Sequence, residues 1–232
     1  MKVILKSLVF VSFFALLSAC SNEAKTPELI KKTERVIVKE QIKEGDLLVE
    51  EYEFDKIQKV RHGKSTMYYP SGKIMVEQNY EDNKFHGPKT FYYESGQIMS
   101  KETYEKGEKN GPFAFYYENG NLKQEGTYNK SAIVGICKGY YETGQLKESV
   151  TFVDGWENGP FEEYSEKGSI AAKGHYIPNP DPDGVALEHG ILEEYDDNGQ
   201  LKTKKECENG ICYTIWDAVK GDIKPNKLPI HQ

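Results

Sequence analysis

The feature that most constrains this chain is a 24-residue repeat that occupies most of its length. The copy that begins at Gly87 reads GPKTFYYESGQIMSKETYEKGEKN, and the next copy opens at Gly111 with GPFAFYYENGNL. Six copies open at Gly63, Gly87, Gly111, Gly135, Gly159 and Gly190. A fixed period of this kind predicts a repeat architecture, in which neighbouring units stack to share a core.

The positions that every copy keeps predict one β-hairpin per repeat. Each copy has a tyrosine five residues after its opening glycine, a second glycine nine residues after it, and an aliphatic residue two further on. An aromatic first strand, a Glu-Ser-Gly or Glu-Asn-Gly turn and an alternating second strand are typical of a hairpin. We expect Ile98 and Tyr104 to share one face of the second strand. Because a single hairpin is marginal in water, the sequence predicts an all-β fold, an elongated twisted antiparallel sheet of tandem hairpins.

The first 19 residues are predicted to be a signal peptide. Lys2 and Lys6 precede a short apolar run, which is too short to span a membrane, and small residues precede Cys20. The sequence Leu17-Ser-Ala-Cys20 resembles the lipobox of bacterial lipoproteins, which implies a lipid on Cys20 and anchoring of the mature chain to a membrane. Ser21 resembles the outer-membrane sorting class. The expected location is therefore the bacterial cell envelope, as an outer-membrane lipoprotein facing the periplasm or the cell surface.

The remaining chain divides into three parts. Residues 20–44 carry the predicted lipid and are otherwise expected to form a polar, flexible tether, in which Val36-Ile-Val38 could be a strand or a helical turn. Residues 45–216 form the array, with a half-repeat cap that starts at Gly45, and residues 217–232 form a tail.

The array is interrupted once. The stretch from Ile177 to Glu188 lengthens the last connection by seven residues, and its three prolines exclude a regular strand. We expect a protruding loop, in which Asn179, Asp181 and Asp183 are candidate binding residues. The alternative is a tolerated insertion without a role.

Of the other three cysteines, two are expected to form a pair and one to stand alone. Cys207 and Cys212 flank an Asn-Gly turn and would face each other in a non-hydrogen-bonded pair, so we predict a disulfide that staples the end of the array. A redox role is the alternative. Cys137 stands where other copies have phenylalanine, so we interpret it as a small buried apolar residue.

Charge and side-chain chemistry limit the function. The formal net charge is −7, and it becomes −9 without Lys2 and Lys6, so nucleic acid is not an expected partner. His62 and His86 precede repeat glycines, which we attribute to turn conformations rather than to a metal site. No nucleophile, base and orienting group recur together at a fixed spacing, and we predict a protein that is not an enzyme and needs no cofactor or metal.

The pattern Gly-x4-Tyr-Tyr-x2-Gly-x-Leu/Ile resembles the bacterial variant of the MORN repeat, and the array is similar to members of the family labelled antitoxin-like. This resemblance, over residues 45–213, implies a scaffold fold rather than one activity. Ser165 and Asp196 depart from it by replacing the second tyrosine.

Two functions are consistent with the sequence. The first is a membrane-anchored interaction module, whose in-register tyrosines bind a protein, peptide or glycan. The four candidate residues are Tyr69, Tyr93, Tyr117 and Tyr141. These rings could instead cover the sheet or form its core. The second function is neutralisation of a toxin, in which the acidic charge would mask a basic partner.

Overall fold

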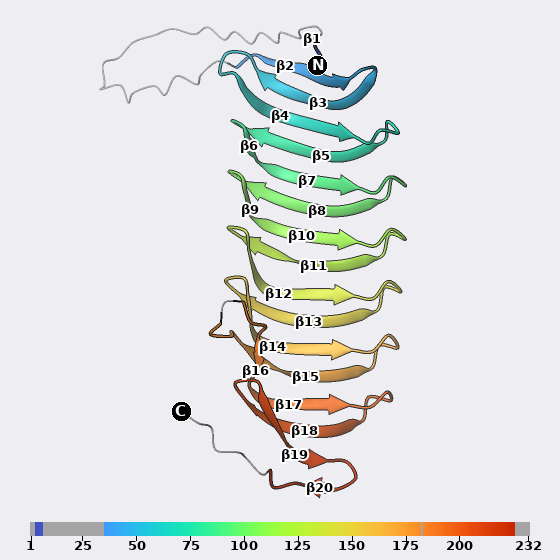
Figure 1. Ribbon diagram of the computed structural model, residues 1–232, viewed down its shortest axis with the longest axis vertical. Helices are drawn as coiled ribbons and strands as arrows, with labels where there is room; N and C mark the ends of the chain where they lie inside the picture. The colour runs from blue at the N-terminus through green and yellow to red at the C-terminus, as the bar shows by residue number, and fades with distance from the viewer. Residues whose placement is uncertain (1–2, 7–34, 182, 226–232) are drawn as a thin grey trace, which may run out of the picture.

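All strands of the described residues lie in one antiparallel sheet, which Figure 1 shows as a tall, narrow stack of hairpins. The computed structural model describes residues 3–6, 35–181 and 183–225, so Cys20 and most of the predicted signal peptide lie outside the described residues. The described part of the chain contains no helix, and hence none that could cross a membrane. The predicted all-β fold of tandem hairpins is confirmed.

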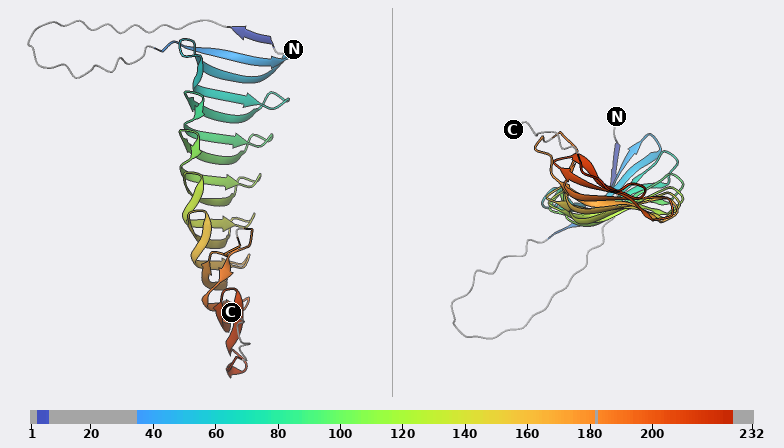
Figure 2. Two further views of the ribbon diagram at one scale, coloured as in Figure 1. Left: turned by 60° about the vertical axis from the view of Figure 1, so that its left-hand side comes forward. Right: turned by 90° about the horizontal axis from the view of Figure 1, so that it is seen from below.

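The first ten strands are β1 (Val3–Lys6), β2 (Ile37–Glu44), β3 (Leu47–Asp55), β4 (Val60–Tyr68), β5 (Ile74–Glu81), β6 (Lys84–Phe85), β7 (Gly87–Tyr92), β8 (Ile98–Glu105), β9 (Glu108–Lys109) and β10 (Gly111–Tyr116). The others are β11 (Leu122–Asn129), β12 (Ala132–Tyr140), β13 (Leu146–Val153), β14 (Trp156–Tyr164), β15 (Ile170–Ile177), β16 (Leu187–Glu188), β17 (Gly190–Tyr195), β18 (Leu201–Glu208), β19 (Ile211–Asp217) and β20 (Gly221–Asp222). Seen end-on in Figure 2, the central hairpins superpose and the two ends fan apart, as expected of a twisted sheet.

Two kinds of turn join the strands. At the first, Gly96 has a φ of +96° and donates its N–H to the Tyr93 carbonyl at 2.8 Å, as the Glu-Ser-Gly sequence predicts. At the second, two successive residues adopt positive φ, for example Lys106 at 52° and Gly107 at 96°. Such two-residue turns match the right-handed twist of the strands.

The opening glycine of each copy is a bend in a strand rather than part of a turn. Gly111 has a φ of +111°, and a Cβ there would lie 3.3 Å from the Thr103 side chain. The preceding residues, including His62 and His86, do not have positive φ. Our explanation of these histidines by a left-handed turn conformation was therefore wrong, because the glycine itself absorbs the unusual backbone angle.

The two faces of the sheet differ sharply. We call the front face the side that carries Val76, Phe113, Cys137, Val150 and Phe161, all of which are buried. The back face carries threonines, charged residues and tyrosines, for example Thr90, Glu77 and Tyr92. No second layer of described residues packs on either face, so the core is one side-chain layer that remains partly open to solvent.

The array extends further at both ends than the sequence predicted. Ile37–Glu44 was assigned to the tether but forms β2, which pairs along its length with β3, so the cap is a whole hairpin. The charged residues of β2 hide the alternation of apolar and polar residues by which a strand is recognised in a sequence. At the other end, Gly221–Asp222 was assigned to the tail but pairs with β19 as β20. β1 pairs with β2 and lies within the predicted signal peptide, so a chain processed before Cys20 would lack it.

The long connection before the sixth copy is shorter than predicted. Ile177 still belongs to β15, and Leu187–Glu188 forms β16 opposite Ile177 and Tyr176. The predicted exclusion of a strand was therefore wrong for these terminal residues, because the prolines lie between them. Residues 178–181 and 183–186 form the part that projects beyond the strands.

Candidate interaction surface

The four tyrosines predicted as a binding column form a ladder between copies. Each of Tyr69, Tyr93, Tyr117 and Tyr141 is half-buried. Their hydroxyls donate to the backbone carbonyls of Tyr92, Tyr116, Tyr140 and Tyr164, at 2.7, 2.8, 2.8 and 2.7 Å respectively. Each hydroxyl therefore joins its own copy to the next one. We call these four residues the tyrosine ladder.

The ladder stops where the repeat departs from its pattern. Ser165 occupies the ladder position of the fifth copy, and its buried hydroxyl has no hydrogen-bond partner among the described residues. The first tyrosines of the copies point to the back face instead, where the Tyr68 and Tyr92 hydroxyls donate to Glu51 and Glu77 at 2.9 and 2.7 Å.

In the first three copies, cations lie among the aromatic rings of the front face. The Arg61 guanidinium donates to Glu50 at 2.6 and 2.9 Å and lies 4.3 Å from the Tyr52 ring centroid. Lys109 pairs with Glu102 at 2.6 Å. These pairs neutralise carboxylates that the sheet itself buries.

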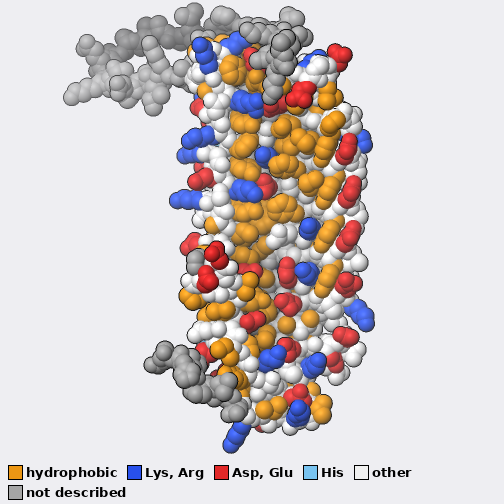
Figure 3. Space-filling model, viewed as in Figure 1, with side chains coloured by type: hydrophobic (Ala, Val, Ile, Leu, Met, Phe, Trp, Pro, Cys, Tyr) orange, Lys and Arg blue, Asp and Glu red, His pale blue; other side chains and the backbone are white. Residues whose placement is uncertain are grey.

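Lys89 differs from the other two cations. Its ammonium lies 4.1 Å from the Phe85 ring centroid and 4.8 Å from that of Phe91. No described carboxylate lies within ion-pair distance of it, and burial lowers the pKa of Lys89. Figure 3 shows hydrophobic side chains gathered in a broad band over this upper part of the face.

In the last three copies, carboxylates predominate on the front face, although Lys205 pairs there with Glu194 at 2.6 Å. Glu148, Glu157, Glu163 and Glu188 surround Tyr176, and burial together with their charges raises the pKa of its hydroxyl to about 12. Burial and the nearby Glu148 also raise the pKa of both Glu157 and Glu163. Acidic side chains accordingly interrupt the hydrophobic band in the lower part of Figure 3.

The predicted binding loop uses its polar groups on itself. Asn179 donates its side-chain N–H to the Val185 carbonyl at 2.9 Å and accepts from the backbone N–H of Asp181 at 2.9 Å. Asp181 accepts in turn from the Asp183 N–H at 3.0 Å. Among the described residues, no group of acidic, histidine or cysteine side chains is arranged to hold a metal ion. His62 lies beside Asp82 at 3.4 Å, and His86 lies beside Glu81 at 3.3 Å.

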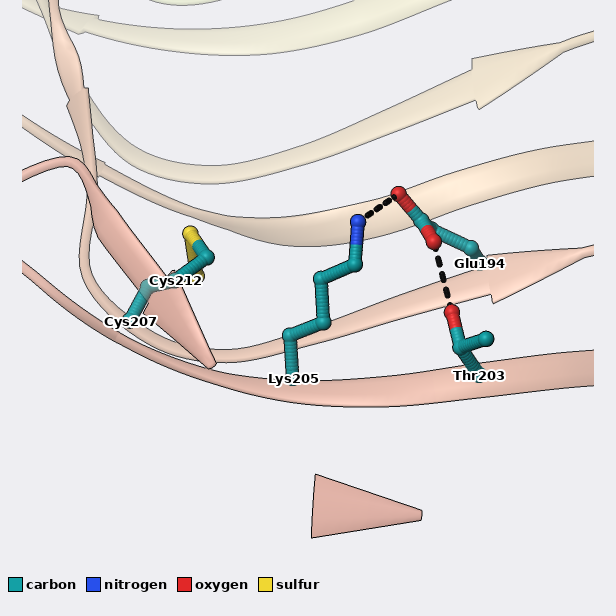
Figure 4. The surroundings of a disulfide bond; sticks show 5 residues. All are labelled: Glu194, Thr203, Lys205, Cys207 and Cys212. Atoms are coloured by element: carbon teal, nitrogen blue, oxygen red, sulfur yellow. Dashed lines mark hydrogen bonds and ion pairs between the residues drawn. A yellow bond between two sulfur atoms is a disulfide. The ribbon is translucent and has the colours of Figure 1, made fainter. Parts of the chain in front are cut away.

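The predicted disulfide is present. Cys207 and Cys212 are directly opposite across the turn, with a Cα–Cα distance of 4.0 Å and an S–S bond. Figure 4 shows the bond near Lys205, which pairs with Glu194 at 2.6 Å. Cys137 is free and buried, as the sequence suggested, and burial raises the pKa of its thiol.

Sequence reasoning missed the front-face ion pairs and the carboxylates around Tyr176. A signal was present, since the residues two positions before the repeat glycines change from basic or apolar to acidic along the chain.

The repeats themselves match a known family, described as MORN repeat variant. The matching segments are residues 61–82, 85–106, 109–130, 133–154 and 188–207. The fifth copy is outside these segments, yet it forms the hairpin of β14 and β15 like its neighbours. No curated protein matches this chain.

Proposed function

We propose that the protein is a non-enzymatic, lipid-anchored interaction module of the bacterial cell envelope. The match of five of its segments to the MORN repeat variant supports this proposal, because repeats of that kind generally serve as scaffolds or interaction modules rather than as catalytic domains. The protein presents the front face of its array to a protein, peptide or glycan partner, and it binds no nucleic acid.

One observation carries the proposal. The front face bears a band of half-buried aromatic side chains that no described residue covers, with charged groups among them. Contiguous apolar surface with a polar surround marks interaction sites on soluble domains. Anchoring rests on the lipobox resemblance at Cys20, and the chain between Cys20 and β2 provides the spacer that holds the sheet away from the lipid.

The tyrosine ladder is an unsuitable centre for recognition, because its hydroxyls are engaged between copies. We place the partner instead on the aromatic residues beside it. Phe85, Phe91 and Tyr104 meet there around Lys89, and the rings of Phe85 and Tyr104 are 5.4 Å apart. Aromatic side chains with a nearby cation suit a protein, peptide or glycan surface.

The test is affinity capture of envelope proteins with the full, lipidated chain. We expect Phe85→Ala with Lys89→Ala to abolish capture and the back-face pair Thr90→Ala with Lys101→Ala to retain it. Circular dichroism would check that both variants fold. Equal capture by both variants would contradict a front-face site, and failure of Cys20→Ser to abolish labelling by a radioactive fatty acid would contradict the anchor.

The second candidate function is neutralisation of a toxin. The observation that favours it is the unpaired acidic surface around Tyr176, which would complement a basic partner. Recovery of a basic toxin in the same capture experiment would select this function. Recovery of other envelope proteins alone would reject it.

A further inference from the structure

The front face changes charge along the array at equivalent positions of the repeat. Two residues before the opening glycine, the six copies have Arg61, Phe85, Lys109, Ile133, Glu157 and Glu188. Four residues after it, they have Met67, Phe91, Phe115, Gly139, Glu163 and Glu194. Apolar and basic side chains in the first copies thus give way to glutamates in the last ones. We call the part of the front face formed by copies four to six the acidic half.

The carboxylates of the acidic half oppose one another across the strands. Glu148 is directly opposite Glu163 in the β13–β14 ladder, and like charges in that arrangement destabilise a sheet. Gly139, on the other side of Glu148, lacks the Cβ that would lie 2.6 Å from the Glu148 carboxylate. The glycine therefore leaves room for this carboxylate to lie across β12.

The contrast with the first copies is informative. There, Glu50 and Glu102 are paired with Arg61 and Lys109 at 2.6 Å each. In the acidic half, Glu194 pairs with Lys205 at 2.6 Å, whereas Glu148, Glu157, Glu163 and Glu188 have no ion pair or side-chain hydrogen bond with any described residue. At Glu163, the positive charge of Lys147 partly offsets the negative charges of Glu148 and Glu188. A local arrangement that costs stability without a compensating contact is expected where a surface has a function.

Buried apolar residues lie between the carboxylates of the acidic half, and we call this strip of Cys137, Val150 and Phe161 its floor. Cys137, Val150 and Phe161 are at most 9% exposed, and the Phe161 ring stacks on Tyr176 with centroids 4.0 Å apart. Long cationic side chains suit such a surface, because their aliphatic stems can lie on the rings while their charged ends reach the carboxylates. The floor runs from β12 to β17, about 19 Å at about 4.8 Å per strand, which is the length of about six extended residues.

We infer that the acidic half docks a basic, extended protein segment. This inference rests on the proposed role as an interaction module and goes beyond it, because it assigns a second site on the same face, in copies four to six rather than around Lys89. Charge complementarity selects this occupant over the alternatives. A nucleic acid or an anionic lipid surface would be repelled. A second copy would bring its own carboxylates, while its Arg61 and Lys109 already pair within their own sheet and its Lys89 lies against the Phe85 and Phe91 rings.

The test measures binding of a fluorescein-labelled octapeptide of alternating lysine and valine to the purified full chain, by fluorescence anisotropy at 150 mM salt. The same peptide with glutamate in place of lysine is the ligand control. Glu157→Gln with Glu163→Gln removes two charges from the acidic half, whereas Glu162→Gln with Glu166→Gln removes two from the same copy outside it, on the back face and in the turn. The front variant relieves repulsion and is expected to fold at least as well as the wild type.

We expect the front variant to weaken binding of the lysine peptide about tenfold and the control variant to change it less than twofold. Equal weakening by both variants would show that only net charge matters and would overturn the inference. Equal binding of the glutamate peptide would overturn it too. Self-association of the wild type that the front variant abolishes, seen by light scattering, would assign the face to a second copy instead.

The peptide experiment is independent of the lipid and of envelope extracts. Loss of anchoring in the Cys20→Ser variant, or of capture in the Phe85→Ala and Lys89→Ala variant, tests the proposed function without altering the acidic half. Failure of either proposal can therefore be recognised by itself.

Discussion

Replacing Tyr117 with phenylalanine would remove one rung of the tyrosine ladder while keeping its ring. The hydroxyl donates to the Tyr140 carbonyl at 2.8 Å, and a neutral hydrogen bond of this kind contributes about 0.5–1.5 kcal/mol. Because the variant leaves that carbonyl without its donor, we expect a loss of about 1 kcal/mol. For a domain of this size, that corresponds to a fall in melting temperature of about 2–4 °C.

Tyr117→Ser would remove the ring as well. Full burial of an aromatic side chain stabilises a fold by about 1.5–3 kcal/mol, and this ring is half-buried, so we expect a total loss of about 2–2.5 kcal/mol. The matched control is Ser165→Ala at the ladder position of the fifth copy. It removes a buried hydroxyl that has no partner among the described residues and should change stability by less than about 0.5 kcal/mol.

Urea unfolding followed by fluorescence gives the overall change in free energy. Repeat arrays can unfold in parts, so hydrogen exchange at β10 to β13 should be measured too, because the rung joins those hairpins. Unchanged stability and exchange in Tyr117→Phe would refute the ladder as a stabilising device. A folded Tyr117→Ser variant that loses its envelope partner would instead support the binding column that the sequence suggested.

Three further predictions concern other contacts of the array. Cys212→Ser should cost about 2 kcal/mol, the chain-entropy value for such a short loop, and reductant should produce the same shift in wild-type urea unfolding; no shift in either would contradict the staple. Arg61→Gln should cost about 2–3 kcal/mol in thermal unfolding, since Glu50 is only 8% exposed and would lose its cation, and adding Glu50→Gln should recover part of the loss. Two lysines lower the pKa of Glu193 to about 2, so the stabilisation by its carboxylate is complete above about pH 4.5 and disappears as the pH falls through about 2. Glu193→Gln should therefore lose less stability than the wild type in an acid titration over that range. Equal losses would refute the role of the two lysines at Glu193.

Local rules were sufficient for much of the fold. The 24-residue period and the turn glycines such as Gly96 predicted tandem hairpins, because each depends only on neighbours along the chain. The Cys207–Cys212 bond was predictable for the same reason, since an Asn-Gly turn fixes which residues face each other. The ends of the array were less predictable, because β2 and β20 are recognised by the strands they pair with rather than by their own pattern.

The roles of side chains on the faces needed the tertiary structure. We expected the side chains of β8 to alternate without interruption from Ile98 to Tyr104. In the pairing of β7 with β8, the register shifts between Phe91 and Tyr92, which breaks this alternation next to Ile98. Sequence alone could not say that the Tyr93 hydroxyl reaches the backbone of the next copy, because that distance depends on how two hairpins stack.

The sequence by itself determined the repeating unit, its turns and its covalent staple, since these are set within about one period of the chain. Only the tertiary structure decided which charged side chains meet on the front face of the sheet. It paired Glu50 and Glu102 with cations and left Glu148 and Glu163 facing each other. The physical reason is that charge interactions act over the few ångströms between adjacent strands, and strand register brings together residues that are 7 to 15 positions apart in the chain.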